Sequence, residues 1–234
     1  MTERKIKAIL SDAGGILFDD RPYKVKEYLF VRDFMDVSYR EFMDEFHLLR
    51  NKAQQIEGYS KVDALKEYLD IHDLSEHFPK YAAYAAEYDA KHFGKPEQLV
   101  KDGVIKTLQG LQEEGIDFIV LTDSTRPLSQ HRSEVFDPAG LSPYITAFYS
   151  SKELGVKKPA AEFFQYVLDE KQLSPDEVLW VAHDLDEIIG GYEFGFVVAA
   201  VNYNPDLEES GELDQIKDNG YLLNHFRDLL TLVE

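Results

Sequence analysis

The chain of 234 residues, 44% hydrophobic and 13% aromatic, is long enough for one or two globular domains with a sizeable core. Its formal net charge of −19 argues against a nucleic acid or an anionic membrane as partner, because either would need a basic surface. The chain has no cysteine, which excludes disulfides and thiolate chemistry, and no run approaches the roughly 20 apolar residues of a membrane helix. We therefore expect a soluble, cytoplasmic protein, with monomer and homodimer both left open.

The hydrophobic spacing changes twice along the chain. Residues 5–12 are apolar and β-prone and predict a buried strand. From about 20 to 93 the spacing is helical, with a capping box predicted at Ser38 and Glu41. Beyond that point helical runs alternate with strand-like ones, at 118–122, 145–150, 178–182 and 196–201. This pattern predicts an α/β core with a parallel sheet, interrupted after its first strand by a helical insertion.

Asp12 stands at the carboxyl end of the first predicted strand, where open α/β sheets bind their ligands. Gly14 and Gly15 follow it and allow the backbone to close tightly around whatever Asp12 faces. A single acid after a strand is weak evidence for an active site. The order of the segments that follow Asp12 makes this prediction more specific.

Four segments combine a strand with residues capable of chemistry. In chain order they are Asp12-Ala13-Gly14-Gly15-Ile16-Leu17-Phe18-Asp19, Leu121-Thr122-Asp123-Ser124, Gly155-Val156-Lys157-Lys158-Pro159 and Val181-Ala182-His183-Asp184-Leu185-Asp186-Glu187. Together they resemble the motifs of the haloacid dehalogenase superfamily of hydrolases, helical-cap type, with a degenerate first motif. The resemblance implies a Rossmann-like sheet core, residues 1–19 and 94–234, and a helical cap, residues 20–93, that closes over the active site.

The resemblance also implies roles for individual residues. Asp12 corresponds to the nucleophile, Thr122 to the hydroxyl that orients the group under attack, and Lys158 to the ammonium that stabilises negative charge beside the nucleophile. The neighbouring positions of the same motifs are expected to contact substrate: Gly15, Asp123, Ser124 and His183.

The first motif departs from the usual Asp-x-Asp-Gly-Thr-Leu at two places. Gly14 replaces the second Asp, whose acid–base help is worth roughly 10²–10⁴-fold in rate, and Ile16 replaces the Thr. Gly14 retains the backbone carbonyl that the family offers to magnesium. A Mg²⁺ cofactor held by Asp12, the Gly14 carbonyl and either Asp184 or Glu187 is therefore expected, with the choice between the last two left open.

Three functions remain open. A phosphatase-like hydrolase of a small anionic metabolite is favoured by analogy, since phosphatases are the commonest members of the superfamily. Carbon–halogen or phosphonate cleavage is the alternative, because a halide leaves without a proton and the spacing of the fourth segment matches the 2-haloacid dehalogenases. Against it, Met43 stands where those enzymes carry a cap arginine, Arg40 being only nearby, and no cap lysine of the phosphonatase kind can be singled out. A catalytically degenerate binding protein is the third reading.

Overall fold

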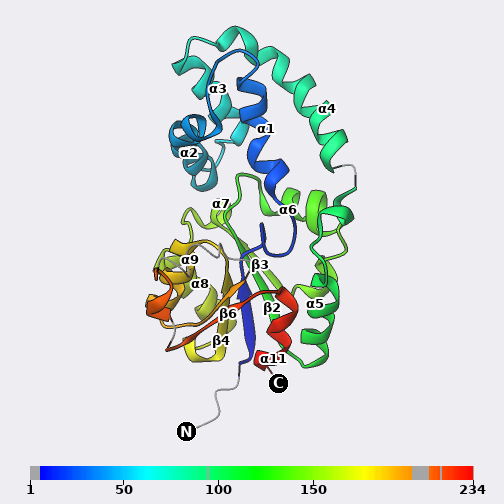
Figure 1. Cartoon of the computed structure of the whole chain (residues 1–234), viewed down its shortest axis with the longest axis vertical. Coiled ribbons are helices and arrows are strands. Elements are labelled where there is room, and N and C mark those ends of the chain that lie inside the picture. Colours follow the sequence, from blue (N-terminus) through cyan, green and yellow to red (C-terminus); the bar gives the residue numbers. More distant parts are fainter. Residues whose placement is uncertain (1–5, 94, 202–210, 217, 234) are drawn as a thin grey trace.

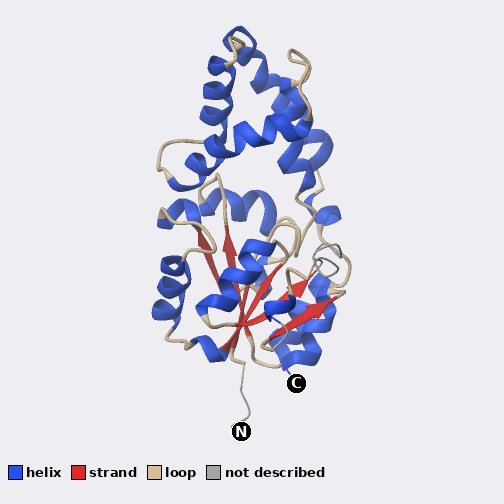
Figure 2. Cartoon of the chain, turned by 60° about the vertical axis from the view of Figure 1, so that its left-hand side comes forward, coloured by secondary structure: helices blue, strands red, loops and turns tan. Residues whose placement is uncertain are grey.

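The computed structural model describes residues 6–93, 95–201, 211–216 and 218–233. Over these residues the chain forms a parallel sheet flanked by helices, with four further helices lying beyond one end of the sheet (Figures 1 and 2). No helix among the described residues is long and apolar enough to cross a membrane.

The sheet has six parallel strands in the order β3-β2-β1-β4-β5-β6. Their bounds are β1 Ala8–Ser11, β2 Asp117–Thr122, β3 Ala147–Ser150, β4 Val178–Ala182, β5 Val197–Val201 and β6 Gly220–Leu223. The predicted α/β class with a parallel, Rossmann-like sheet is confirmed, and five strands fall where the alternation placed them. The sixth was not predicted, because this short edge strand is only half-buried and lacks a long apolar run.

The order of the strands places a crevice above β1. From β1 the chain adds β2 and β3 on one side, and then returns to add β4 and β5 on the other side. Open α/β sheets bind ligands at the carboxyl ends of the strands at such a switch point. Asp12 follows β1 directly, and its backbone N–H donates to the Val181 carbonyl of β4 at 3.0 Å. The fold therefore fixes Asp12 in the crevice.

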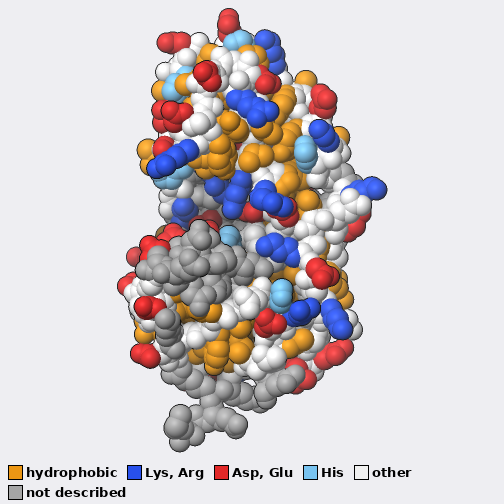
Figure 3. Space-filling view, in the orientation of Figure 1, with side chains coloured by type: hydrophobic (Ala, Val, Ile, Leu, Met, Phe, Trp, Pro, Cys, Tyr) orange, Lys and Arg blue, Asp and Glu red, His pale blue; other side chains and the backbone are white. Residues whose placement is uncertain are grey.

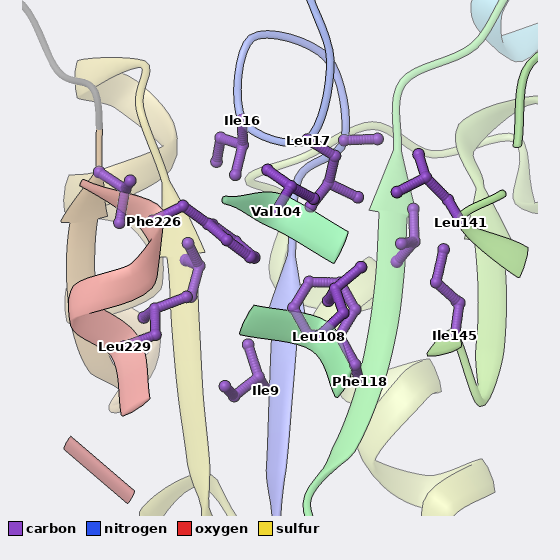
Figure 4. Close-up of a cluster of buried hydrophobic side chains, with 14 of the residues drawn as sticks. Ile9, Ile16, Leu17, Val104, Leu108, Phe118, Leu141, Ile145, Phe226 and Leu229 are labelled. Atoms are coloured by element: carbon purple, nitrogen blue, oxygen red, sulfur yellow. The ribbon is translucent and has the colours of Figure 1, made fainter. Parts of the chain in front are cut away.

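Alternate residues of each central strand feed two hydrophobic cores. Ile9 and Phe118 face one side, where they pack with α5 (Val104–Glu113) and the C-terminal α11 (Leu230–Val233) (Figure 4). Leu10 and Trp180 face the other side, against α8 (Ala161–Lys171) and α9 (Leu185–Phe194). Two short helices, α6 (Leu128–His131) and α7 (Ser151–Leu154), follow β2 and β3. Burial on both faces explains why the central strands read as continuous apolar runs.

The insertion after β1 consists of α1 (Arg21–Val31), α2 (Tyr39–Gln55), α3 (Lys61–Ile71) and α4 (Tyr81–Phe93). The capping box predicted at Ser38 and Glu41 is present and starts α2. The four helices enclose a third core, rich in aromatic rings, that is separate from the two cores of the sheet. The helical insertion predicted after the first strand is therefore present, and these four helices are called the cap below (Figure 1).

The outgoing and returning connections between the two parts run side by side. Phe18 and Val100 form an antiparallel bridge, the Asp19 N–H donates to the Leu99 carbonyl at 2.8 Å, and the Lys101 N–H donates to the Leu17 carbonyl at 3.0 Å. The limits predicted for the two domains stay a prediction, and the second limit, at Gly94, lies outside the described residues.

Candidate active site

A cavity of about 290 Å³ lies between the helical cap and the carboxyl ends of β1, β2 and β4. Seven lysine or arginine side chains line it, although the chain as a whole carries a net charge of −19. Blue side chains gather in the same zone, at the junction of the two parts, in Figure 3. All but one of the residues predicted for the site line this cavity: Asp12, Gly14, Thr122, Asp123, Ser124, Lys158, His183, Asp184 and Glu187. The exception is Gly15, which packs against the His183 ring.

The Lys158 ammonium lies between two carboxylates at the bottom of the cavity. It donates to Asp12 Oδ1 and lies 3.0 and 3.1 Å from the two carboxylate oxygens of Glu187, in the first turn of α9. Asp12 is 9%, Lys158 5% and Glu187 8% exposed. A buried charge of this kind requires a partner, and each of the three groups has one.

The charges around Lys158 set the ionisation of this cluster. Burial by itself lowers the pKa of the Lys158 ammonium, but Asp12 and Glu187 outweigh it and raise that pKa above its usual value. Burial raises the pKa of the Glu187 carboxyl to about 8, because the pull of Lys158 only partly offsets it and the charge of Asp12 adds to the rise. The lysine therefore stays protonated beside Asp12 through the neutral pH range.

The loop after β2 forms the second wall. Thr122 ends the strand and is 5% exposed. The Asp123 carboxylate accepts the Lys158 backbone N–H at 3.2 Å, and burial raises its pKa. The Ser124 N–H donates to Ser151 Oγ at 3.2 Å. Asp123 and Ser124 thus hold the loop in place beside Lys158, while Thr122 faces the cavity.

His183 lies between the carboxylates of Asp12 and Asp184. Its Nε2 is 3.6 Å from Asp12 Oδ2 and its Nδ1 is 3.3 Å from Asp184 Oδ1. Gly15, at a φ of +75°, makes room for the ring, since a Cβ there would lie 2.6 Å from His183 Nε2. The two Asp12 oxygens thus face different groups, Oδ1 the ammonium and Oδ2 the imidazole.

The predicted magnesium ligands do not fit an ion as they are placed. The His183 ring lies between Asp12 and Asp184, the two carboxylates that would share the ion. Glu187 turns both of its oxygens to Lys158. Among the described residues, no three His, Asp or Glu side chains converge as a metal site would need. The magnesium site stays a prediction of the family resemblance.

The cap contributes residues that the sequence did not single out. Gln54 Nε2 donates to the Asp123 carbonyl at 3.1 Å, and Lys157 Nζ donates to Asn51 Oδ1 at 2.7 Å. Arg50 lines the cavity from the same end of α2, and none of the described acidic side chains pairs with it. No local pattern marks these residues, because they become part of the site only when α2 packs against the core.

His131, in α6, is a further cavity residue that the motifs did not indicate. Its Nδ1 is buried and has no hydrogen-bond partner among the described residues. Burial lowers the pKa of its imidazole to about 4, with the nearby Arg126 adding to the effect. His131 therefore presents a neutral ring to the cavity.

A family model described as haloacid dehalogenase-like hydrolase matches residues 6–195. A glyceraldehyde 3-phosphate phosphatase from Methanocaldococcus jannaschii is 29% identical over 133 residues, 56% of this chain and 54% of that protein. A ribulose-1,5-bisphosphate 5-phosphatase from Halopiger xanaduensis is 31% identical over 86 residues, 37% of this chain and 35% of that protein. The match thus spans about half, or less, of these relatives. The crystal structure of a predicted phosphoglycolate phosphatase from Haemophilus somnus shares the fold, with a TM-score of 0.67 at 16% identity and full coverage of both chains.

Proposed function

The chain belongs to the haloacid dehalogenase-like hydrolases, and from that premise we propose that it hydrolyses a small phosphorylated metabolite, with Asp12 as the nucleophile. The observation that carries the proposal is the buried contact of Asp12 with the Lys158 ammonium at the bottom of a cavity lined by cationic side chains. The two relatives named as phosphatases support a phosphate ester as substrate.

The geometry suits a two-step displacement. Because Lys158 holds Oδ1 of Asp12, Oδ2 is the oxygen left to attack phosphorus. The attack forms an aspartyl phosphate and breaks the ester bond to the leaving alcohol, and water then releases inorganic phosphate and regenerates Asp12. Lys158 and the Thr122 hydroxyl stabilise the charge on the phosphoryl oxygens during both displacements.

The leaving oxygen needs a proton that Gly14 has no side chain to supply. In this proposal His183 is the donor, since its ring lies 3.6 Å from the attacking oxygen and Asp184 lies 3.3 Å from its other nitrogen. A carboxylate on the far nitrogen holds an imidazole in one orientation. This proposed acid role is additional to the contact with substrate expected for His183.

Arg50 is the cap residue that we assign to the substrate anion. It lines the cavity without a described acidic partner, whereas the neighbouring cations Lys24 and Lys61 are paired with Asp20 and Glu27. A guanidinium without a carboxylate is free to bind a phosphate or carboxylate group with two parallel hydrogen bonds.

The test is phosphate release from a panel of phosphorylated metabolites, with Mg²⁺ and with EDTA, by the wild type and by Asp12→Asn. We expect turnover by the wild type alone. Turnover by both proteins at equal rates would refute the role of Asp12. The EDTA arm decides whether magnesium takes part, as the family resemblance implies, or whether the cationic side chains suffice.

Dehalogenation is the second candidate, and two observations favour it. Gly14 removes an acid that halide departure does not need, and His183 lies between the carboxylates that a metal would share. Chloride release from 2-chloropropionate by the wild type, lost in Asp12→Asn, would select this chemistry. Binding of phosphate without turnover of either substrate class would instead indicate a degenerate binding protein.

A further inference from the structure

The space that a side chain at position 14 would fill is taken by the Asp20 carboxylate. A Cβ built on Gly14 would lie 2.8 Å from Asp20 Oδ2, 3.2 Å from its Cγ and 3.3 Å from its Cβ. Covalent geometry puts the carboxylate oxygen of an aspartate at roughly 2.4 Å from its own Cβ. An Asp20 oxygen therefore lies close to the place that a carboxylate oxygen of an aspartate at position 14 would take. Asp20 also lines the same cavity as Asp12.

Asp20 precedes α1 but does not cap it. It is the N-cap residue of α1, where an aspartate usually accepts an N–H of the first turn, yet its side chain makes no capping hydrogen bond. The neighbouring Asp19 accepts the Arg21 N–H instead, at 3.1 Å, and also pairs with the Arg21 guanidinium. The Asp20 side chain thus caps no first-turn N–H group of α1 and lies against Gly14.

Three cations surround the Asp20 carboxylate. Lys24 Nζ lies 2.9 Å from Asp20 Oδ2, one helical turn along α1. The charges of Arg21 and Lys101 also act on Asp20 from the two connections between cap and core. These cations hold the Asp20 carboxylate beside Gly14, at the edge of the cavity.

We infer that Asp20 is the general base that activates water in the second step, in place of the missing acid–base residue at position 14. The inference rests on the proposed function. The Asp20 carboxylate takes a proton from water as the water oxygen attacks the phosphorus of the aspartyl phosphate. The bond between phosphorus and Asp12 breaks, which releases phosphate and the Asp12 carboxylate, and Asp20 then returns its proton to solvent. The second Asp of the usual first motif serves as both acid and base, and in this chain the two functions would be divided between His183 and Asp20.

The experiment uses an aryl phosphate, 4-nitrophenyl phosphate, whose leaving group needs no proton, so that only the second step depends on acid–base help. Wild type, Asp20→Asn and the control Asp19→Asn are compared by rapid mixing and by intact-protein mass spectrometry. Asp19 is the matched control, since it is the adjacent carboxylate and does not line the cavity. We expect Asp20→Asn to show a burst of about one equivalent of nitrophenol, a kcat lower by roughly 10²–10⁴-fold and an accumulating phosphoryl-enzyme. Asp19→Asn should behave as the wild type.

A relocation variant separates a lost base from a damaged fold. Asp20→Gly should be slow, and Gly14→Asp in the same chain should restore turnover, because the three heavy atoms nearest to a Cβ at position 14 all belong to Asp20. Gly14→Asp alone should be slow, since two carboxylates would compete for one space.

The outcomes distinguish the two levels of the proposal. An inactive wild type, on aryl phosphate and on the metabolite panel alike, overturns the proposed function and this inference with it. An active wild type together with an Asp20→Asn variant of unchanged kcat overturns the inference alone. A slow Asp20→Asn variant without a burst or phosphoryl-enzyme also overturns it, because the first step would then be the one affected.

Discussion

Lys152 joins the cap to the core, and we expect its removal to loosen the wall of the cavity. From α7 of the core, its ammonium donates to three carbonyls at and just beyond the end of α2, those of Ala53 at 2.8 Å, Ile56 at 2.5 Å and Tyr59 at 2.7 Å. The last carbonyls of a helix have no partner within the helix, and a cation there also complements the helix dipole. Lys152→Met keeps the length of the side chain and removes all three hydrogen bonds.

The size of the effect follows from these contacts. A hydrogen bond to a charged group contributes about 1.5–3 kcal/mol, but three that share one ammonium do not add fully. We expect Lys152→Met to cost about 2–4 kcal/mol in the docking of the end of α2 on α7. This corresponds to roughly a hundredfold shift in the local opening equilibrium. Because Gln54 at the same end of α2 contacts Asp123, KM should rise as well.

Native-state hydrogen exchange measures this opening directly. The amide of Ile56, which donates to the Lys52 carbonyl at 3.0 Å, should exchange roughly a hundredfold faster in Lys152→Met, while amides of the central strands stay protected. Lys106→Met, at an exposed lysine of α5, is the control. Equal exchange at Ile56 in the wild type and in Lys152→Met would refute the view that Lys152 holds the cap to the core.

Three further predictions concern the site itself. Lys158→Met leaves the buried Asp12 carboxylate without its cation and Glu187 without a hydrogen-bond donor, and should lower the free energy of unfolding by about 3–5 kcal/mol in urea titrations, with loss of activity. A stable, active variant would contradict this role of Lys158. Burial raises the pKa of the Glu187 carboxyl to about 8, so the native state keeps a proton that the unfolded chain releases near pH 4.5. The stability that this proton contributes is therefore lost as the pH rises through about 8. In Glu187→Gln, the loss of stability between pH 5 and pH 9 should be smaller than in the wild type. An unchanged pH profile of thermal unfolding would argue against a raised pKa of Glu187. Gly15→Ala forces a side chain into a backbone with φ +75° and against the His183 ring, and should cost about 1–2 kcal/mol in stability and reduce kcat more than it raises KM.

Much of the core was predictable from local pattern alone. The central strands are buried on both faces, so their apolar runs are long and the residues that follow them stand out, as Asp12 does after β1 and Thr122 at the end of β2. The capping box at Ser38 is likewise a local signal, since the residues that form it lie within one turn of helix. The edge strand β6 escaped prediction, because half-burial on the edge of a sheet leaves no strong hydrophobic pattern.

The parts of the site that the motifs did not indicate are held by contacts between segments far apart in the chain. Gln54 meets Asp123 across 69 residues, and Lys157 meets Asn51 across 106. Neither contact has a signature in the sequence, because polar residues on an exposed helix face look the same whether or not another domain covers them. Asp20 is the instructive case, since its position before α1 indicates a helix cap and only the folded loop turns its carboxylate to Gly14.

The sequence by itself determined the fold class, the order of the four segments and the absence of a side chain at Gly14, since each depends on residue identity and on spacing within one element. Only the tertiary structure decided which groups surround Asp12: the Lys158 ammonium with Glu187 behind it, His183 between two carboxylates, and Asp20 in the space above Gly14. The physical reason is that charges act through space over a few ångströms, and the distance between two side chains is set by how the strands and the cap pack and not by their separation along the chain.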